Sequence, residues 1–216
     1  ETYHGAPQAD AIAYAWPCLK HSDRFIRYAA RVAVEHQPVS EWLEKTLAEK
    51  DPETLTQAAI GLARKGDVAI RNRVLGALMG INYGQLQAPQ QLDLLRAFEL
   101  VLYRMGMPDT MIKNQIANYL SPAYPAKTNE LNRALSKVLV YVDAPGAIQK
   151  TLDLLATATD DSTNQNTLTS SSDLILRNPQ YGLDIASTLS KVPPAQQTFY
   201  ATVLSNTKKG WTPEQR

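Results

Sequence analysis

The chain has 216 residues, 44% of them hydrophobic and 20% charged, which is typical of a globular protein and excludes a disordered one. Its 22 Lys and Arg residues nearly balance 21 Asp and Glu residues. The resulting net charge of +1 argues against a dedicated nucleic-acid-binding protein, which usually has a strong basic excess. The one cysteine, Cys18, excludes an internal disulfide and a cysteine-rich metal site. No apolar run approaches the ~18 residues that a membrane-spanning helix needs, so we expect no membrane span.

Apolar residues recur at offsets of three and four along most of the chain, which is the spacing of one face of an α-helix. These stripes cover roughly residues 25–33, 39–47, 55–63, 74–79, 94–105, 112–120, 131–142 and 148–155. Asp51 followed by Pro52 predicts a helix start, because Asp caps free amides and Pro fits the first turn. No segment alternates with period two for long enough to predict a strand. We therefore predict an all-α fold.

A polar segment interrupts this pattern over residues 157–172, where Thr, Ser, Asn and Asp replace almost every apolar residue. Such a composition predicts a polar loop or an insertion. Beyond it, apolar stripes near residues 181–189 and 199–204 predict two further helices.

The domain organisation follows from these stretches. Residues 16–156 are expected to form helical repeats, and residues 173–216 to form C-terminal helices after the polar segment. The chain opens without Met and both ends look cut. We therefore expect residues 1–15 to be a cut N-terminal segment and residues 173–216 to be truncated at the junction to a following domain.

Breaks between the predicted helices return every ~30 to 40 residues, which is typical of stacked helix pairs. Residues 23–30, Asp-Arg-Phe-Ile-Arg-Tyr-Ala-Ala, have the turn-Asp, aliphatic, Arg, Ala order of the second helix of a HEAT-type pair; residues 93–98 repeat it and residues 132–135 do so faintly. The sequence thus predicts a HEAT/ARM-like, right-handed α-α superhelix of about ten to twelve helices. An irregular helical bundle is the alternative.

Catalytic and cofactor motifs are missing from the sequence. There is no Gly-x-Ser-x-Gly, P-loop, dinucleotide-binding Gly pattern, His-Glu-x-x-His or Cys-x-x-Cys-His. Cys18 and His21 are three residues apart, but a buried thiol is the better interpretation than a catalytic pair. HEAT-type iron hydroxylases need His-Glu pairs, and this chain has only the reversed Glu35-His36, which we assign to a helix end. We predict no catalytic, cofactor-binding or metal-binding residue.

Three arginines are candidates for an interaction face: Arg27, Arg64 and Arg96, expected on the second helices of successive pairs. Solenoids gather side chains from several repeats on one concave surface, where these arginines would meet a partner. The alternative is that the arginines pair locally with neighbouring acidic residues, namely Asp23, Glu35, Asp67, Asp93 or Glu99.

A set of sequence phrases resembles one protein family. The phrases occupy residues 16–19, 23–31, 35–39 with Trp42, 60–67, 94–102, 139–145 and 150–152. Together they resemble the HEAT-repeat region of the large extracytoplasmic haem-binding, membrane-bound dehydrogenase-type (cytochrome c) multidomain proteins of planctomycetes and their relatives. The resemblance covers residues 16–155 and 196–216, and departs over 157–194. It implies an extracytoplasmic location, with a β-propeller and a cytochrome module elsewhere in the polypeptide.

The resemblance carries over no active-site residue to this chain. We therefore expect a non-catalytic helical-repeat scaffold, or protein-interaction module, within a larger secreted redox or carbohydrate-related protein. Its partner would be another domain of the same polypeptide or a separate protein, and not a nucleic acid. Two alternatives stay open: a HEAT-like DNA-binding or DNA glycosylase-type domain, and part of an enzyme whose site is completed by other domains.

Overall fold

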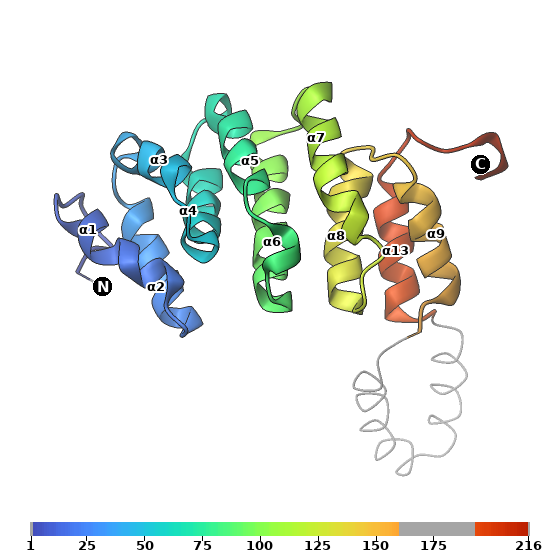
Figure 1. The fold of residues 1–216 in the computed structure, drawn as a ribbon, viewed down its shortest axis with the longest axis horizontal. Helices are drawn as coiled ribbons and strands as arrows, with labels where there is room; N and C mark the ends of the chain where they lie inside the picture. Colours follow the sequence, from blue (N-terminus) through green and yellow to red (C-terminus); the bar gives the residue numbers. More distant parts are fainter. Residues whose placement is uncertain (1, 160–192, 216) are drawn as a thin grey trace, which may run out of the picture. The chain divides into compact units, whose positions relative to one another are not determined.

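A computed structural model describes residues 2–159 and 193–215, and within these residues every regular element is a helix (Figure 1). This part of the chain holds ten α-helices, several short 3-10 helices and no strand. The prediction of an all-α fold is confirmed, and the arrangement is consistent with a helical-repeat superhelix. None of the described helices is long and apolar enough to cross a membrane. The chain divides into two compact units, residues 1–144 and 145–216.

The first unit consists of successive helix pairs. Its α-helices are α1 (Ala11–Ala15), α2 (Arg24–Glu35), α3 (Val39–Ala48), α4 (Pro52–Lys65), α5 (Arg71–Met79), α6 (Ala88–Met105), α7 (Thr110–Leu120) and α8 (Asn129–Tyr141). A 3-10 helix, Trp16–Lys20, continues α1 and packs on α2. We call α2, α4, α6 and α8 the second helices, because each closes one pair.

The pairs stack in two rows (Figure 1). The second helices contact one another in order, α2 with α4, α4 with α6 and α6 with α8. The first helices form the other row, in which α3 contacts α5 and α5 contacts α7. The predicted placement of Arg27, Arg64 and Arg96 on second helices therefore agrees with the structure, since they belong to α2, α4 and α6.

Aspartates begin several of these helices, as the sequence predicts for Asp51. The Asp51 carboxylate accepts a hydrogen bond from the Thr54 amide at 2.9 Å, and Pro52 occupies the first turn of α4. Asp23 and Asp109 cap α2 and α7 in the same way. These caps satisfy amides that have no partner inside the helix, so each helix start is fixed by a local bond.

The core lies between the two rows and is continuous along the unit. All ten residues from 54 to 63 of α4 are buried, because α2 and α6 flank this helix and α3 covers it. Trp42 of α3 is fully buried against Gly61, where a Cβ atom would lie 3.2 Å from the indole ring. Leu94, Leu95 and Phe98 bury the corresponding side of α6. Each such side chain stabilises the fold by about 1.5–3 kcal/mol through burial.

The second unit contains two described α-helices, α9 (Ala147–Thr157) and α13 (Ala195–Ser205), which pack together. They confirm the helices predicted from the stripes at 148–155 and 199–204. The side-chain amide of Gln215 donates a hydrogen bond to the side-chain oxygen of Gln149 at 2.6 Å, which holds the end of this unit on α9. Most of the predicted polar loop, residues 157–172, and the helix predicted near 181–189 lie outside the described residues.

Candidate functional site

The three arginines singled out from the sequence do not contact one another; each has its own acidic partner. Arg27 lies 3.5 Å from Glu53 of α4 and donates hydrogen bonds to the carbonyls of His21 and Ser22 at 2.7 and 3.0 Å. Two anchoring hydrogen bonds and an ion pair make Arg27 part of the framework that joins α2 to α4. Arg64 and Arg96 instead belong to two clusters, each with a second cation.

The α2–α4 cluster consists of Arg31, Glu35 and Arg64. Glu35 of α2 lies 3.3 Å from Arg31 and 3.4 Å from Arg64, so one carboxylate sits between two guanidinium groups from adjacent second helices. Its side chain is only 3% exposed. Burial raises the pKa of Glu35, although Arg64 and Arg31 oppose the shift, and burial lowers the pKa of Arg31. The cluster is thus a desolvated bridge across the α2–α4 contact.

The α6–α8 cluster consists of Arg96, Glu99 and Lys137. Glu99 of α6 lies 2.9 Å from Arg96 on its own helix and 3.0 Å from Lys137 of α8. The Glu99 side chain is 29% exposed, so water reaches it. Burial acts to raise its pKa, but the hydrogen bonds from Lys137 and Arg96 outweigh burial and lower the pKa.

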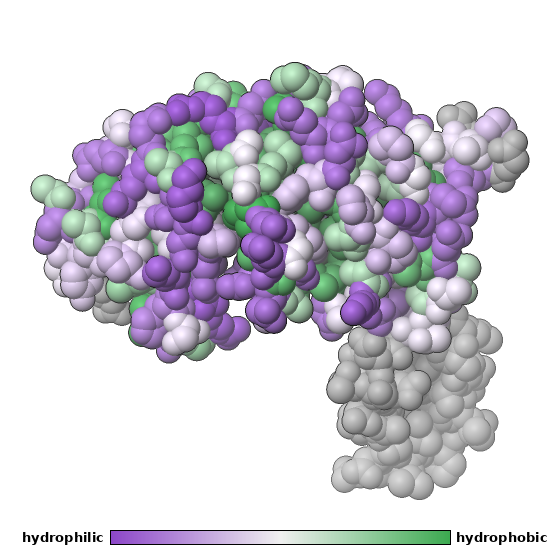
Figure 2. Space-filling view, viewed as in Figure 1, coloured by the Kyte–Doolittle hydropathy of each residue, from purple (hydrophilic) through white to green (hydrophobic). Residues whose placement is uncertain are grey.

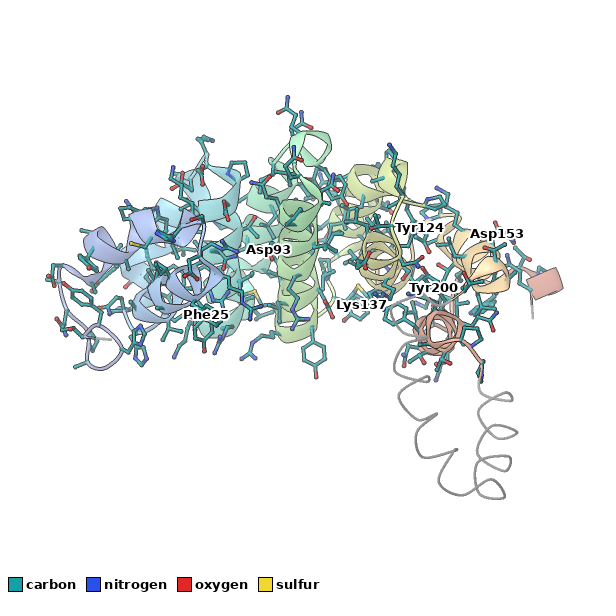
Figure 3. All side chains as sticks on the ribbon, turned by 90° about the horizontal axis from the view of Figure 1, so that it is seen from below. Phe25, Asp93, Tyr124, Lys137, Asp153 and Tyr200 are labelled. Atoms are coloured by element: carbon teal, nitrogen blue, oxygen red, sulfur yellow. The ribbon has the colours of Figure 1, made fainter. Side chains whose placement is uncertain are left out.

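A small hollow lies between α4 and α6. It is lined by Pro52, Glu53, Thr56, Gln57, Leu86, Gln90 and Asp93. Figure 3 shows Asp93 on the side of α6 toward α2 and α4, and Lys137 toward the gap between α6 and α8. Burial raises the pKa of Asp93, while Arg27 and Arg31 act in the opposite direction. The enclosed space is about 10 Å³, roughly one water molecule and too small for a metabolite.

Exposed aromatic residues accompany these cations on the second helices. Tyr103 of α6 is 83% exposed, and Phe25 and Tyr28 of α2 and Tyr141 of α8 are exposed as well. The Arg24 guanidinium lies over Phe25 at 4.7 Å, and that of Arg31 lies over Tyr28 at 5.3 Å. On the face of the molecule that Figure 2 draws, by contrast, hydrophilic residues predominate and apolar ones form separate small areas.

Several of these residues lie on the side of their helix opposite its buried stripe, which we call the second-helix face. It carries Arg24, Tyr28, Arg64, Arg96, Tyr103, Lys137 and Tyr141. The spacing supports this: Arg96 and Tyr103 are seven residues apart on α6, and Lys137 and Tyr141 are four apart on α8. This face combines exposed aromatic rings with cations.

The aromatic residues of this face were not predicted from the sequence. The apolar stripe predicted over residues 25–33 includes Phe25 and Ile26, but their exposed fractions are 68% and 40%. The prediction was wrong for Phe25 because the packed side of α2 is centred on Ala30, Ala33 and Val34, from which Phe25 points away. Residues 24–28 contain two arginines, each followed directly by an aromatic residue, and this pattern could have predicted that Phe25 and Tyr28 are exposed, because such pairs form cation–π contacts at the surface.

The remaining candidate residues have ordinary structural partners. The Cys18 thiol lies 3.9 Å from the Tyr14 carbonyl, whereas the His21 ring accepts a hydrogen bond from the Asp23 amide at 3.0 Å. The hydrogen bonds of Cys18 and His21 thus go to other groups, and Cys18 is half-buried, so the interpretation of a buried thiol was wrong. His36 caps the end of α2, as predicted. Within residues 2–159 and 193–215, no group of three or more His, Cys, Asp or Glu side chains is placed to hold a metal ion.

Comparison of the chain with protein-family models, curated proteins and solved structures found no match.

Proposed function

We propose that this chain is a non-catalytic helical-repeat scaffold that binds a protein partner through the second-helix face. The observation that carries the proposal is the distribution of exposed aromatic side chains. Four exposed aromatic residues, Phe25, Tyr28, Tyr103 and Tyr141, belong to second helices. Among the first helices, α1 exposes Tyr14, α7 exposes Met111, and α3 and α5 expose no large hydrophobic residue.

The chemistry of this face suits protein recognition. Tyrosine and arginine are enriched among the residues that dominate binding energy at protein interfaces, because they combine a large apolar area with a polar group. Bridges between neighbouring helices, such as the α2–α4 cluster, hold the face in one arrangement before a partner arrives. A preorganised surface loses less conformational entropy on binding.

The resemblance of residues 16–155 to the repeat region of extracytoplasmic multidomain proteins supports a further part of the proposal. The scaffold would operate outside the cytoplasm, with another domain of the same polypeptide as its partner. The complete reading frame tests this: a secretion signal and a Cys-x-x-Cys-His motif are expected there, and a frame with neither contradicts it.

A matched pair of photo-crosslinking positions tests the scaffold function. Tyr103 on α6 and Met111 on α7 are both exposed, but they lie on a second and a first helix. Each is replaced in turn by the photoreactive p-benzoyl-L-phenylalanine in cells that express the protein. We expect one defined adduct from position 103 and little from position 111. Equal adducts from both positions, or none from position 103, would exclude the second-helix face as the binding surface.

A further inference from the structure

The second helices carry more positive charge than the chain as a whole. Together α2, α4, α6 and α8 contain nine Lys and Arg residues against five Asp and Glu residues, a net charge of +4, whereas the whole chain has +1. Half of this surplus lies in two clusters. In both the α2–α4 cluster and the α6–α8 cluster two cations share one carboxylate, so each cluster has a net charge of +1.

The surplus charge is accessible to a partner. Arg64, Arg96 and Lys137 keep between 37% and 55% of their side chains exposed, so each has donors left for another acceptor. An exposed aromatic ring lies on the same helix as one cation of each cluster: Tyr28 beneath Arg31, and Tyr103 seven residues after Arg96. Each cluster therefore has an exposed ring on the same helix, in contact with Arg31 in the first cluster and roughly 10 Å along the helix from Arg96 in the second.

On this basis we infer that the second-helix face binds an extended acidic segment of a protein, with one carboxylate group at each cluster. This inference rests on the proposed function and names the chemistry of the partner. Neighbouring packed helices lie roughly 10 Å apart, and the two clusters are two helix spacings apart, so their separation is about 20 Å. An extended chain advances ~3.3 Å per residue, so the two acidic positions are about six residues apart.

A peptide fits this face better than a nucleic acid does. Phosphates along a nucleic-acid strand call for a continuous row of free cations, and binding strength scales with their number. Here Arg27, Arg31, Arg64, Arg96 and Lys137 each already face a carboxylate, and the two clusters together hold +2 of the net charge of +4 at two separate points. Two separated charges match two spaced side-chain carboxylates.

Fluorescence anisotropy with the full chain tests the inference. The probe is a labelled eight-residue peptide with glutamates at positions 1, 2, 7 and 8, so that equivalent glutamates are six residues apart, and with a neutral middle that contains Tyr. Comparison peptides carry Gln in place of Glu, or the same four glutamates side by side. We expect the spaced peptide to bind best and its affinity to fall with added salt.

Charge-removing variants locate the binding surface. Arg96→Gln, Lys137→Gln and Arg64→Gln should each weaken binding of the spaced peptide about tenfold, as expected for one lost charge-assisted contact. The matched control is Arg73→Gln on the first helix α5, which removes the same charge from a similarly exposed, carboxylate-paired arginine. It should leave binding unchanged. Because Arg64 also bridges α2 to α4, and Lys137 bridges α8 to α6, Arg96→Gln is the variant whose effect does not depend on a bridge between helices.

Three results would overturn the inference. One is an equal loss of binding in Arg73→Gln, which means non-specific attraction. Another is tighter binding of a 20-nucleotide oligothymidylate than of the spaced peptide, which identifies a nucleic-acid surface. The third is no binding of the peptide while position 103 still yields its defined crosslink. In that case the scaffold function stands and the acidic partner is wrong.

Discussion

The α2–α4 and α6–α8 clusters share a charge pattern and differ in burial. In each, a glutamate lies between two cations and links neighbouring second helices, but the Glu35 side chain is 3% exposed and that of Glu99 is 29% exposed. Burial raises the pKa of the first carboxyl; in the second, hydrogen bonds to Lys137 and Arg96 outweigh burial and lower the pKa. In the α2–α4 cluster the carboxylate is thus buried and Arg64 is the member that solvent reaches, whereas in the α6–α8 cluster water reaches the carboxylate and both cations.

The largest difference in stability between the two clusters is expected when the glutamate of each is replaced by alanine. Glu35→Ala leaves the Arg31 and Arg64 charges without their counter-charge at a buried contact, and should lower the free energy of unfolding by about 2–4 kcal/mol. Glu99→Ala leaves two cations that water can reach, and should cost about 0.5–1 kcal/mol. Urea unfolding followed by circular dichroism measures both. Equal losses would remove the distinction between the clusters.

A pair of glycine substitutions tests how tightly the α2–α4 contact is packed. A Cβ atom on Gly61 would lie 3.2 Å from the Trp42 ring and 3.4 Å from Glu35 Cγ, and Trp42 is fully buried. Gly61→Ala should therefore lose about 1 kcal/mol of stability despite the better helix propensity of alanine. Gly76 of α5 has no atom within 4 Å of its Cβ position, so Gly76→Ala should gain about 0.5–1 kcal/mol. A gain for both variants would show that the α2–α4 contact is loose.

The sequence predicted the helices well because apolar spacing and helix caps are local properties. Asp51 and Pro52 begin α4 as predicted, and Gly106 ends α6 with a φ of +78°, where glycine is favoured. The interaction face was predicted only in part. Arg64 and Arg96 were singled out, but Tyr103 follows Val101 and Leu102 directly in an apolar stretch. Only the packing of α6 against its neighbours decides that Val101 is buried and Tyr103 exposed.

The ion pairs were harder to predict for the same reason. Glu35 and Glu99 were among the acidic partners considered, but Glu53 as the partner of Arg27 and Lys137 as the second cation at Glu99 were not. Each of these pairs joins residues 26 or 38 positions apart in the chain, on helices whose register against each other depends on packing. No local pattern specifies that register.

Two arginine variants test whether Arg27 stabilises the fold while Arg96 is a surface residue with little effect on stability. Arg27→Ala removes two hydrogen bonds to the carbonyls of His21 and Ser22 together with the contact to Glu53, and should lower stability by about 1–2 kcal/mol. Arg96→Ala removes an exposed pair within one helix and should change stability by less than about 0.5 kcal/mol. The melting temperatures of both variants, each compared with that of the wild type, measure these losses. A larger loss for Arg96→Ala would mean that the α6–α8 cluster is structural.

A further difference between the two glutamates, and the one with a distinctive sign, is the pH dependence of their contributions to stability. The folded state raises the pKa of Glu35, so in the interval between its ordinary and raised values the folded chain binds a proton that the unfolded chain does not. Stability from Glu35 therefore increases as the pH falls through that interval. For Glu99 the pKa is lowered, so its contribution is present above the ordinary glutamate pKa of about 4.3 and is lost as the pH falls below it.

Glutamine substitutions isolate each effect, because Gln has nearly the same shape and does not titrate. Between pH 7 and pH 4, wild type should gain stability relative to Glu35→Gln, by about 1.4 kcal/mol for each unit by which the pKa is raised. Relative to Glu99→Gln, wild type should lose stability as the pH falls toward 3. Other carboxyls titrate alike in wild type and variant, so they cancel in each difference. If both differences in stability, wild type minus Glu35→Gln and wild type minus Glu99→Gln, change with pH in the same direction, burial does not distinguish Glu35 from Glu99. The two clusters would then be electrostatically equivalent.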